Sequence, residues 1–171
     1  MLTKLNLLEL LRSNGLDFQI HEHEPLYTVD DSEKLRGEIS GAHTKNLFLK
    51  NKKGNFYLFS CDEKAKVDLK KFSKAIDAKN LSFANEVYLE KYLSIKPGSV
   101  SPFALLNDVE NIVTFYLDEN LANSSVINFH PLVNTSTVSL KTKDFINFIL
   151  EKNKKINIFS LESYNIIKTY E

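Results

Sequence analysis

The sequence predicts a mixed α/β fold of the α+β kind, in which helices flank a largely antiparallel sheet. The expected elements run helix, strand, helix, hairpin, helices, strands, helix, and so do not alternate as a parallel sheet would require. Two apolar runs also flank the turn at residues 51–54, a pattern typical of an antiparallel hairpin. A chain of 171 residues without repeats or linkers is expected to form one domain over residues 1–171. Its core would reach about residue 153, with a C-terminal extension over about residues 154–171.

The first half of the chain opens with an amphipathic helix, because Leu5, Leu8 and Leu11 recur at helical spacing. Thr3 is its expected N-cap and Gly15 its expected C-terminal glycine. Alternation over residues 17–24 predicts a half-buried strand, and residues 29–39 predict a short helix or turn. The hairpin over residues 45–61 is the clearest pattern in the sequence.

The second half continues with helical periodicity and charged outer faces over residues 66–76 and 85–95. Strands are expected over residues 111–118, 125–130 and 136–140. An amphipathic helix over residues 141–153 is expected to start near Thr142. Residues 156–161 would then form an edge strand, followed by a polar tail.

Composition narrows the function classes. Lys+Arg and Asp+Glu each total 22, which argues against a non-specific nucleic-acid coat but not against a local basic face. A single cysteine rules out an internal disulfide and suits a reducing compartment. No apolar run is long enough to cross a bilayer, and the N-terminus has the pattern of a helix rather than a signal peptide. A soluble, cytoplasmic protein without a membrane partner is expected.

The four prolines gather in three short loops, "HEPLYT", "KPGSVSP" and "HPLVNTST". Proline fixes φ, and the glycine among them permits close backbone approach. Either these residues simply end strands and helices, or they pre-organise a pocket. The polar residues that the same loops carry favour a pocket: His23, Thr28, Ser99, Ser101, His130, Asn134 and Thr135.

Four segments then occur in a recognisable order: "HEPLYT" at residues 23–28, "HTKNLFL" at 43–49, "PGSVSPFAL" at 97–105 and "FHPLVNTSTVSL" at 129–140. Together they resemble the prolyl-tRNA editing proteins of the YbaK/ProX type. These are free-standing aminoacyl-tRNA deacylases, and the same domain is inserted in many bacterial prolyl-tRNA synthetases. The resemblance runs from the first helix to the helix at residues 143–152. It implies a central antiparallel, barrel-like sheet flanked by helices.

The resemblance implies hydrolysis of the ester that links a wrong amino acid to the 3′ adenosine of tRNA(Pro). Because this ester is already activated, the site needs a positioned water, donors for the oxyanion and a selective pocket, but no cofactor. A hydrophobic pocket gains only about 1–3 kcal/mol per methylene, so a synthetase for proline admits alanine and a second, smaller sieve must remove it. The branch that this chain resembles most acts on alanyl-tRNA(Pro), while related branches take cysteine, serine or threonine esters.

The resemblance assigns catalytic roles to Lys45, Gly98, Ser99 and His130. Lys45 would contact a phosphate, a ribose oxygen or the aminoacyl carbonyl; otherwise it is a solvated lysine at a strand start. Gly98 and Ser99 belong to a turn whose N–H groups would cradle the carbonyl oxygen or the amino acid. A helix entry with Ser101 as N-cap and Pro102 in the first turn is compatible with this role.

His130 would contact the amino group or hold the water, or else bond a nearby carbonyl as a structural histidine. Asn46 alternates to the sheet face opposite Lys45 and would support the loops. Asp118 would orient His130 or bind an amino group, or simply be an exposed aspartate at a strand end. The other expected substrate-binding residues line or brace the pocket: Ile20, His23, Thr28, Leu47, Val100, Ser101, Pro102, Asn134 and Thr135, with Phe103 and Ser136 beside them.

A lysine-rich segment over residues 64–79 offers contacts for acceptor-stem phosphates. The predicted tRNA-binding residues are Lys66, Lys70, Lys71 and Lys74, with Lys64 and Lys79 nearby. The alternative is an ordinary solvated helix face. The implied partners are tRNA(Pro) mischarged with a small amino acid and, as a second candidate, prolyl-tRNA synthetase. DNA is not expected to bind.

Two other function classes remain open. His21 and His23 would project to one face of a strand, where His43 or His130 could complete a zinc site, although no His-x-x-x-His or cysteine pair is present. The second alternative is a non-catalytic module that binds tRNA or a synthetase. Cys61 follows the second hairpin strand and is expected to be a small buried filler rather than a nucleophile.

Overall fold

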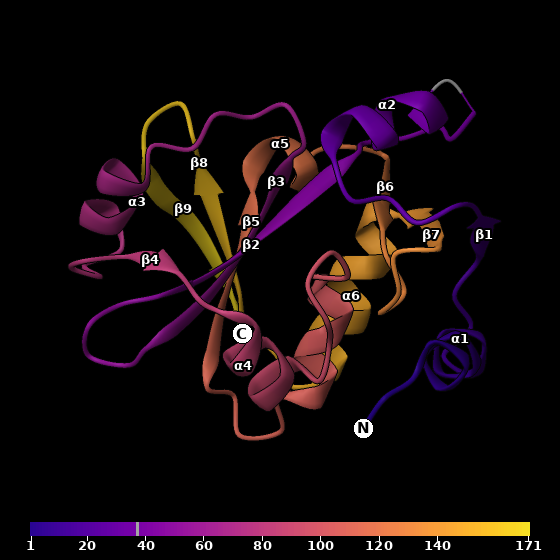
Figure 1. Ribbon diagram of the computed structural model, residues 1–171, viewed down its shortest axis with the longest axis horizontal. Coiled ribbons are helices and arrows are strands. Elements are labelled where there is room, and N and C mark those ends of the chain that lie inside the picture. The colour runs from indigo at the N-terminus through magenta and orange to yellow at the C-terminus, as the bar shows by residue number, and fades with distance from the viewer. Residues whose placement is uncertain (37) are drawn as a thin grey trace.

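A computed structural model describes residues 1–36 and 38–171, and in this part the strands form two sheets (Figure 1). The larger sheet has six strands in the order β4-β2-β3-β5-β8-β9, and the smaller has three in the order β1-β7-β6. The strands are β1 (Phe18–Glu22), β2 (Thr44–Lys50), β3 (Phe56–Asp62), β4 (Ser82–Phe83), β5 (Val113–Asp118), β6 (Val126–Phe129), β7 (Ser136–Lys141), β8 (Ile156–Ser160) and β9 (Asn165–Tyr170). The helices are α1 (Lys4–Ser13), α2 (Val29–Arg36), α3 (Leu69–Ala75), α4 (Glu86–Tyr88), the π-helix η1 (Leu89–Leu93), the 3₁₀-helix η2 (Pro102–Asn107), α5 (Glu119–Ala122) and α6 (Thr142–Glu151).

The mixed α+β class is confirmed, but the barrel-like closure of the sheet is not. The pairs β1–β7, β7–β6, β4–β2, β2–β3 and β8–β9 are antiparallel, whereas β3–β5 and β5–β8 are parallel. Within the described residues, the edges β4 and β9 do not pair with each other, so the larger sheet stays open. The two sheets meet at one corner, where the Ala42 N–H donates to the Val126 carbonyl at 2.8 Å and Ala42 bridges to Ile127.

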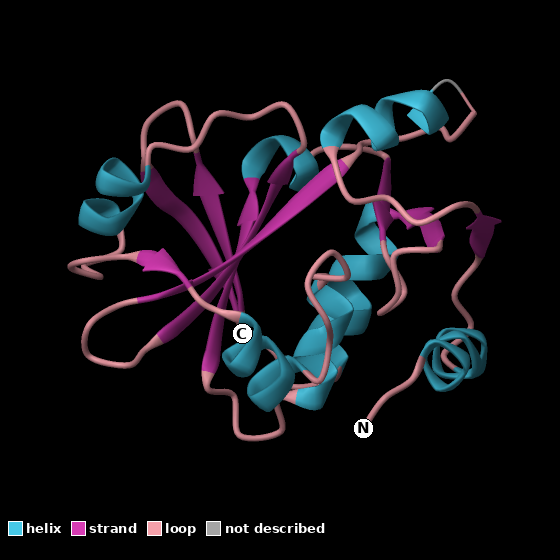
Figure 2. Ribbon diagram, in the orientation of Figure 1, coloured by secondary structure: helices cyan, strands magenta, loops and turns pink. Residues whose placement is uncertain are grey.

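Two hydrophobic clusters cover the two faces of the larger sheet. The first holds α6 between the larger sheet and the smaller one, with Phe145, Phe148 and Ile149 buried (Figure 2). The second lies on the opposite face, where Phe72 of α3 stacks on Phe59 of β3 with 4.8 Å between ring centroids. The alternation along β2 and β3 therefore divides their side chains between two separate cores.

Local signals placed most elements correctly. The Thr3 hydroxyl accepts from the Asn6 N–H at the start of α1, and Gly15 follows the helix with a φ of +74°. The turn at residues 51–54 closes the β2–β3 hairpin through a bond from the Gly54 N–H to the Asn51 carbonyl at 3.2 Å. The predicted stretch 29–39 contains α2, although Gly37 lies outside the described residues. Helix α6 starts at Thr142 as expected.

The C-terminal residues differ from the prediction. The strand expected at an edge is β8, which has β5 on one side and β9 on the other, and the expected polar tail is β9 itself. Strand β8 pairs in parallel with β5 after the chain has crossed over through α6. Such a distant pairing leaves no local pattern in the sequence, so β8 could not be recognised as an inner strand. The two-residue strand β4 was also missed. Among the described residues, no helix is both long and apolar enough to cross a membrane.

Candidate functional site

The three proline-containing loops converge on one cavity of about 270 Å³. It lies where the first residues of β2 meet α2, the loop before η2 and the end of β6. The six predicted residues that line it are Thr28, Lys45, Asn46, Gly98, Val100 and His130. Hydrogen bonds tie two of the loops together, because the His23 N–H donates to the Thr135 carbonyl at 2.9 Å and the Leu26 N–H to the Asn134 carbonyl at 3.2 Å.

Gly98 is the point at which the third loop touches the other two. Its φ is +84°, in the left-handed region that favours glycine. A Cβ at this position would lie 3.6 Å from Asn134 Nδ2 and 3.9 Å from Tyr27 Cδ1. Space for a methyl group therefore exists, and glycine is required here by the backbone conformation rather than by crowding.

The turn around Gly98 presents free backbone donors. The Ser99 N–H closes the turn on the Lys96 carbonyl at 3.1 Å. Within residues 1–36 and 38–171, the N–H groups of Gly98 and Val100 have no hydrogen-bond acceptor. The expected helix entry is also present, since the buried Ser101 hydroxyl accepts from the Phe103 N–H at 3.3 Å and Pro102 opens η2. Ser101 thus caps a helix beneath the cavity and does not line it.

His130 is held in one tautomer. Its Nδ1 lies 2.8 Å from the Ser136 carbonyl oxygen, which can only accept, so Nδ1 carries the proton. Burial lowers the pKa of His130 below its ordinary value, partly offset by this hydrogen bond. The neutral ring therefore keeps Nε2 as an acceptor for a ligand in the cavity.

Lys45 and Asn46 leave β2 on opposite faces, as the strand alternation predicted. Asn46 shares the face of Thr44, whose hydroxyl donates to the Asn128 carbonyl of the smaller sheet at 2.7 Å. Asn46 Oδ1 accepts from the Ser60 hydroxyl at 2.5 Å, which fixes the amide at the cavity wall. The Lys45 ammonium donates to the Ala65 carbonyl in the loop after β3, so this cation sits at the cavity rim with one donor already used.

Several predicted residues brace the site or lie elsewhere. Ser99 is buried and holds the turn. His23 does not line the cavity, because its ring nitrogens bond the Glu24 carbonyl and the Thr137 hydroxyl. Ile20 packs against the first hydrophobic cluster and Leu47 against the second, so neither forms a wall of the cavity. The remaining ones that do not line it are Pro102, Phe103, Asn134, Thr135 and Ser136.

Asp118 is neither an exposed aspartate nor a partner of His130. It is 1% exposed and accepts from the N–H groups of Asp62 and Asn120 at 3.5 and 3.2 Å. Burial raises the pKa of Asp118, with the two backbone donors acting in the opposite direction. This carboxyl caps α5 and joins it to the end of β3, which is a structural role.

Sequence reasoning missed five residues of the cavity wall: Leu26, Tyr27, Ser32, Thr44 and Glu63. The first three adjoin Thr28, which with Asp31 caps α2 reciprocally: the Asp31 N–H donates to Thr28 Oγ1 and the Thr28 N–H to Asp31 Oδ2, both at 3.1 Å. This capping box was readable from the Thr-x-x-Asp spacing. No sequence signal pointed to Glu63, whose N–H donates to the His43 carbonyl at 3.0 Å.

The histidines do not assemble into a metal centre. The Nε2 atoms of His21 and His23 contact the hydroxyls of Ser139 and Thr137 at 3.1 and 2.8 Å, and His43 Nε2 contacts the Ile39 carbonyl at 3.0 Å. Among the described residues, no group of three or more His, Cys, Asp or Glu side chains is placed to hold a metal ion.

Cys61 is fully buried in the second hydrophobic cluster, as expected of a filler. Burial raises the pKa of its thiol to about 12, although the neighbouring Lys45 acts in the opposite direction. The thiolate that a nucleophile requires is therefore disfavoured at neutral pH.

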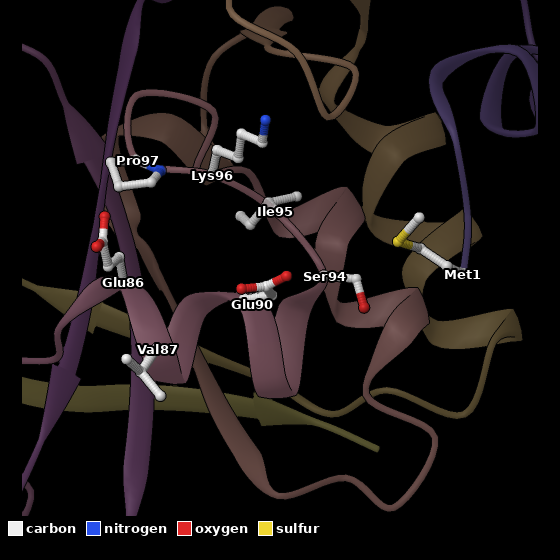
Figure 3. A pocket seen from close by; sticks show the side chains of 8 residues that line it. All are labelled: Met1, Glu86, Val87, Glu90, Ser94, Ile95, Lys96 and Pro97. Atoms are coloured by element: carbon white, nitrogen blue, oxygen red, sulfur yellow. The ribbon is translucent and has the colours of Figure 1, made fainter.

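A larger cavity of about 680 Å³ is lined in part by Lys96 and Pro97, which precede Gly98 in the chain (Figure 3). Glu86 and Val87 of α4 and Glu90 of η1 face it, and Met1 lies opposite them. Its two carboxylates would repel a phosphate-bearing ligand. The smaller cavity, which brings together Lys45, Gly98 and His130, is therefore the better candidate for the site of the resemblance.

The predicted tRNA-binding lysines are exposed, and they lie on and before α3. Lys70 and Lys74 line a surface groove of about 570 Å³ together with Lys79. Lys71 points elsewhere, with its ammonium 5.4 Å from the Tyr164 ring centroid. The loop that carries Lys64 and Lys66 starts at the cavity residue Glu63, so the basic segment begins at the site.

The fold and the cavity agree with the result of comparison with known proteins. Residues 23–148 match the aminoacyl-tRNA editing domain, and the chain belongs to this family. It is 40% identical over 143 residues to the prolyl-tRNA editing protein ProX of Acetoanaerobium sticklandii, covering 83% of this chain and 84% of that protein. It is 32% identical over 156 residues to the prolyl-tRNA synthetase associated domain-containing protein 1 of Danio rerio, covering 90% and 85% of the two chains.

A solved structure has the same fold. A crystal structure of a proposed trans-editing enzyme for prolyl-tRNA synthetase superposes with a TM-score of 0.67 at 18% identity, over 91% of this chain and 96% of that one. At this identity the match concerns the fold alone. The resemblance found in the sequence is thus confirmed at the level of the family.

Proposed function

We propose that this protein is a trans-editing hydrolase that deacylates tRNA(Pro) mischarged with a small amino acid, with alanyl-tRNA(Pro) as the preferred substrate. The observation that carries the proposal is the small cavity at which the loops of Tyr27, Gly98 and His130 meet. Membership in the editing-domain family supports the same reaction class.

The reaction needs a water molecule to attack the ester carbonyl carbon. The bond between this carbon and the ribose oxygen then breaks. One proton of the water ends on the ribose oxygen and the other is released to solvent, so the amino acid leaves as a carboxylate. His130 Nε2 accepts a hydrogen bond from the attacking water, because Nδ1 is engaged by the Ser136 carbonyl. The vicinal ribose hydroxyl of the substrate assists the proton movement.

The oxyanion that forms needs preorganised donors. The unpaired N–H groups of Gly98 and Val100 supply them at the cavity wall. The Lys45 ammonium adds positive charge at the rim once it exchanges the Ala65 carbonyl for a substrate oxygen. In this mechanism water attacks the ester directly, and the buried Cys61 thiol, whose pKa is raised to about 12, takes no part.

Selectivity for alanine rests on exclusion. A hydrogen bond from Ser60 fixes Asn46, and hydrogen bonds to Asn134 and Asp31 fix the loop from Leu26 to Thr28. These parts of the cavity wall therefore resist displacement by a larger ligand. Under this proposal, a prolyl ring would have to displace these braced groups, whereas an alanyl methyl group would not. A discrimination of about 1–3 kcal/mol per methylene is the ordinary range for such a pocket.

The direct test is a panel of tRNA(Pro) charged with Ala, Cys, Ser or Pro and incubated with the purified protein. We expect release of alanine well above the spontaneous rate, with the prolyl ester intact. Faster release of cysteine or serine would assign the chain to another editing specificity. A protein that retards the tRNA but leaves all four esters intact would be a binding module, and the proposal would fail.

A further inference from the structure

Tyr27 is an exposed aromatic residue at the mouth of the cavity. The residue is 74% exposed, and it belongs to the cavity wall. The ring edge lies close to Gly98, where an added Cβ would be 3.9 Å from Tyr27 Cδ1. The ring therefore borders the site while its surface remains open to solvent.

The other tyrosines have partners. The chain contains seven tyrosines, and six of them contact another ring or a cation. In the part of the chain that the structure describes, Tyr27 makes no such contact. An open tyrosine face at a cavity rim is suited to stacking against a flat, partly apolar ligand group.

The backbone on both sides of Tyr27 is nevertheless fixed. The Tyr27 N–H donates to Asp31 Oδ2 at 3.1 Å, and the preceding Leu26 N–H donates to the Asn134 carbonyl at 3.2 Å. Asp31 is held as an acceptor, because the bond from Tyr27 and the bonds from Thr28 lower its pKa. A ring on a fixed backbone loses little conformational freedom when it binds a ligand.

The size of the cavity indicates what lies against this ring. A volume of about 270 Å³ falls just below the range of about 300–1,000 Å³ that encloses a whole drug-sized ligand. The aminoacyl group and the ribose fill such a space, so the base of an aminoacylated nucleoside must remain outside it. Tyr27 is the exposed aromatic residue at the border of this cavity, where such a base would meet it.

We propose that the Tyr27 ring is the stacking platform for the base of the terminal nucleoside that carries the aminoacyl ester. This inference rests on the proposed function and extends it to the recognition of the nucleobase. Aromatic stacking is tolerant of sequence and is the usual way in which proteins hold unpaired bases. Tyr27 is thus a binding residue, and the ester chemistry stays with the groups inside the cavity.

The test compares two acceptor-stem minihelices that carry the same alanyl ester, one ending in adenosine and the other in a ribose without a base. Tyr27→Ala should lower kcat/KM on the adenosine-ended substrate about 5- to 150-fold, the range of about 1–3 kcal/mol per stacked base. On the substrate without a base, Tyr27→Ala should match the wild type. Tyr27→Phe should match the wild type on both substrates, because the ring is kept.

Phe83 supplies the matched control, since it is 61% exposed in β4 and does not line the cavity. Phe83→Ala should leave both rates unchanged. As a readout independent of ester cleavage, a fluorescent aminopurine at the end of an uncharged minihelix should be quenched by wild type and Tyr27→Phe, but not by Tyr27→Ala.

Equal losses on the two substrates, or no loss on the adenosine-ended one, would overturn the stacking role. That result differs from a failure of the proposed function, in which the wild type itself leaves the adenosine-ended alanyl ester intact. If Tyr27 instead contacts a synthetase, Tyr27→Ala would lower affinity for the synthetase with both minihelix rates unchanged, which also overturns the inference.

Discussion

Replacing Gly98 by alanine separates the backbone geometry of the site from the stability of the fold. Gly98 has a φ of +84°, and an alanine there adopts a left-handed conformation at a cost of about 1–2 kcal/mol. The added methyl group meets no atom closer than 3.6 Å, so crowding contributes little. For a chain of this size, each 1 kcal/mol lowers the melting temperature by about 2–4 °C. A decrease of about 2–8 °C is therefore expected.

Gly54→Ala is the matched control. Gly54 has a φ of +83° in the β2–β3 turn, and a Cβ there would meet nothing within 4 Å. The two variants should therefore lose similar stability in a thermal melt followed by circular dichroism. Only Gly98→Ala should slow alanyl-tRNA(Pro) deacylation, because relief of its strain shifts the N–H groups of Gly98 and Val100.

The size of the rate effect follows from the role of these donors. Loss of one oxyanion-hole donor costs about 100- to 1,000-fold in kcat, so a displaced turn should cost at least about 10-fold. The assay is single-turnover release of labelled alanine, at a temperature well below both melting points. Unchanged turnover in Gly98→Ala, or an equal loss in Gly54→Ala, would refute a catalytic role for this turn.

Three further predictions concern side chains of the site. Lys45→Ala should lower the deacylation rate by about 10- to 150-fold, because the lost charged hydrogen bond is worth about 1.5–3 kcal/mol. Lys52→Ala, at an exposed lysine, is the control and should have no effect. Equal rates in the two variants would remove Lys45 from the mechanism. Because burial lowers the pKa of His130, the acid limb of the pH–rate profile should fall below the ordinary value of about 6.5, and an acid limb above it would contradict a buried neutral ring. The same shift means that the unfolded chain takes up this proton first, so the unfolding free energy should decrease as pH falls below about 6.5, more steeply in wild type than in His130→Asn. Cys61→Ser should keep most of its activity while losing about 1–3 kcal/mol of stability to a buried hydroxyl, and an inactive but folded variant would point to a thiol mechanism.

The fold was predictable where local patterns decide it. Three features were placed correctly: the N-cap at Thr3, the helix end at Gly15 and the hairpin turn that contains Gly54. Each depends only on residues a few positions apart in the sequence. The order of the strands was not, because the parallel pairs β3–β5 and β5–β8 join segments separated by whole helices and loops. The open sheet follows from these pairings, which carry no signal at short range.

The site shows the same limit. The convergence of three loops was predictable from their prolines and polar residues, and the cavity contains Gly98, His130 and Thr28. The wall residues Ile20 and Leu47 were assigned from strand position alone, and both turned out to pack into hydrophobic clusters. Glu63 was missed, because its backbone bond to His43 joins residues that are distant in the sequence.

The adjacent pair Lys45 and Asn46 explains how one short motif can serve two purposes. In a strand, neighbouring side chains point to opposite faces, so the two side chains reach the cavity from different sides of β2. Asn46 occupies the face toward the smaller sheet, where Ser60 holds it rigid. The Lys45 stem starts on the other face, and its ammonium reaches the rim through a single bond to the Ala65 carbonyl. A wall that selects by size must be rigid, whereas a cation that meets an incoming oxygen must be able to exchange its partner. The alternation of β2 supplies both properties from two consecutive residues, which is why exchanging Lys45 with Asn46 should abolish editing even though the composition of the cavity is unchanged.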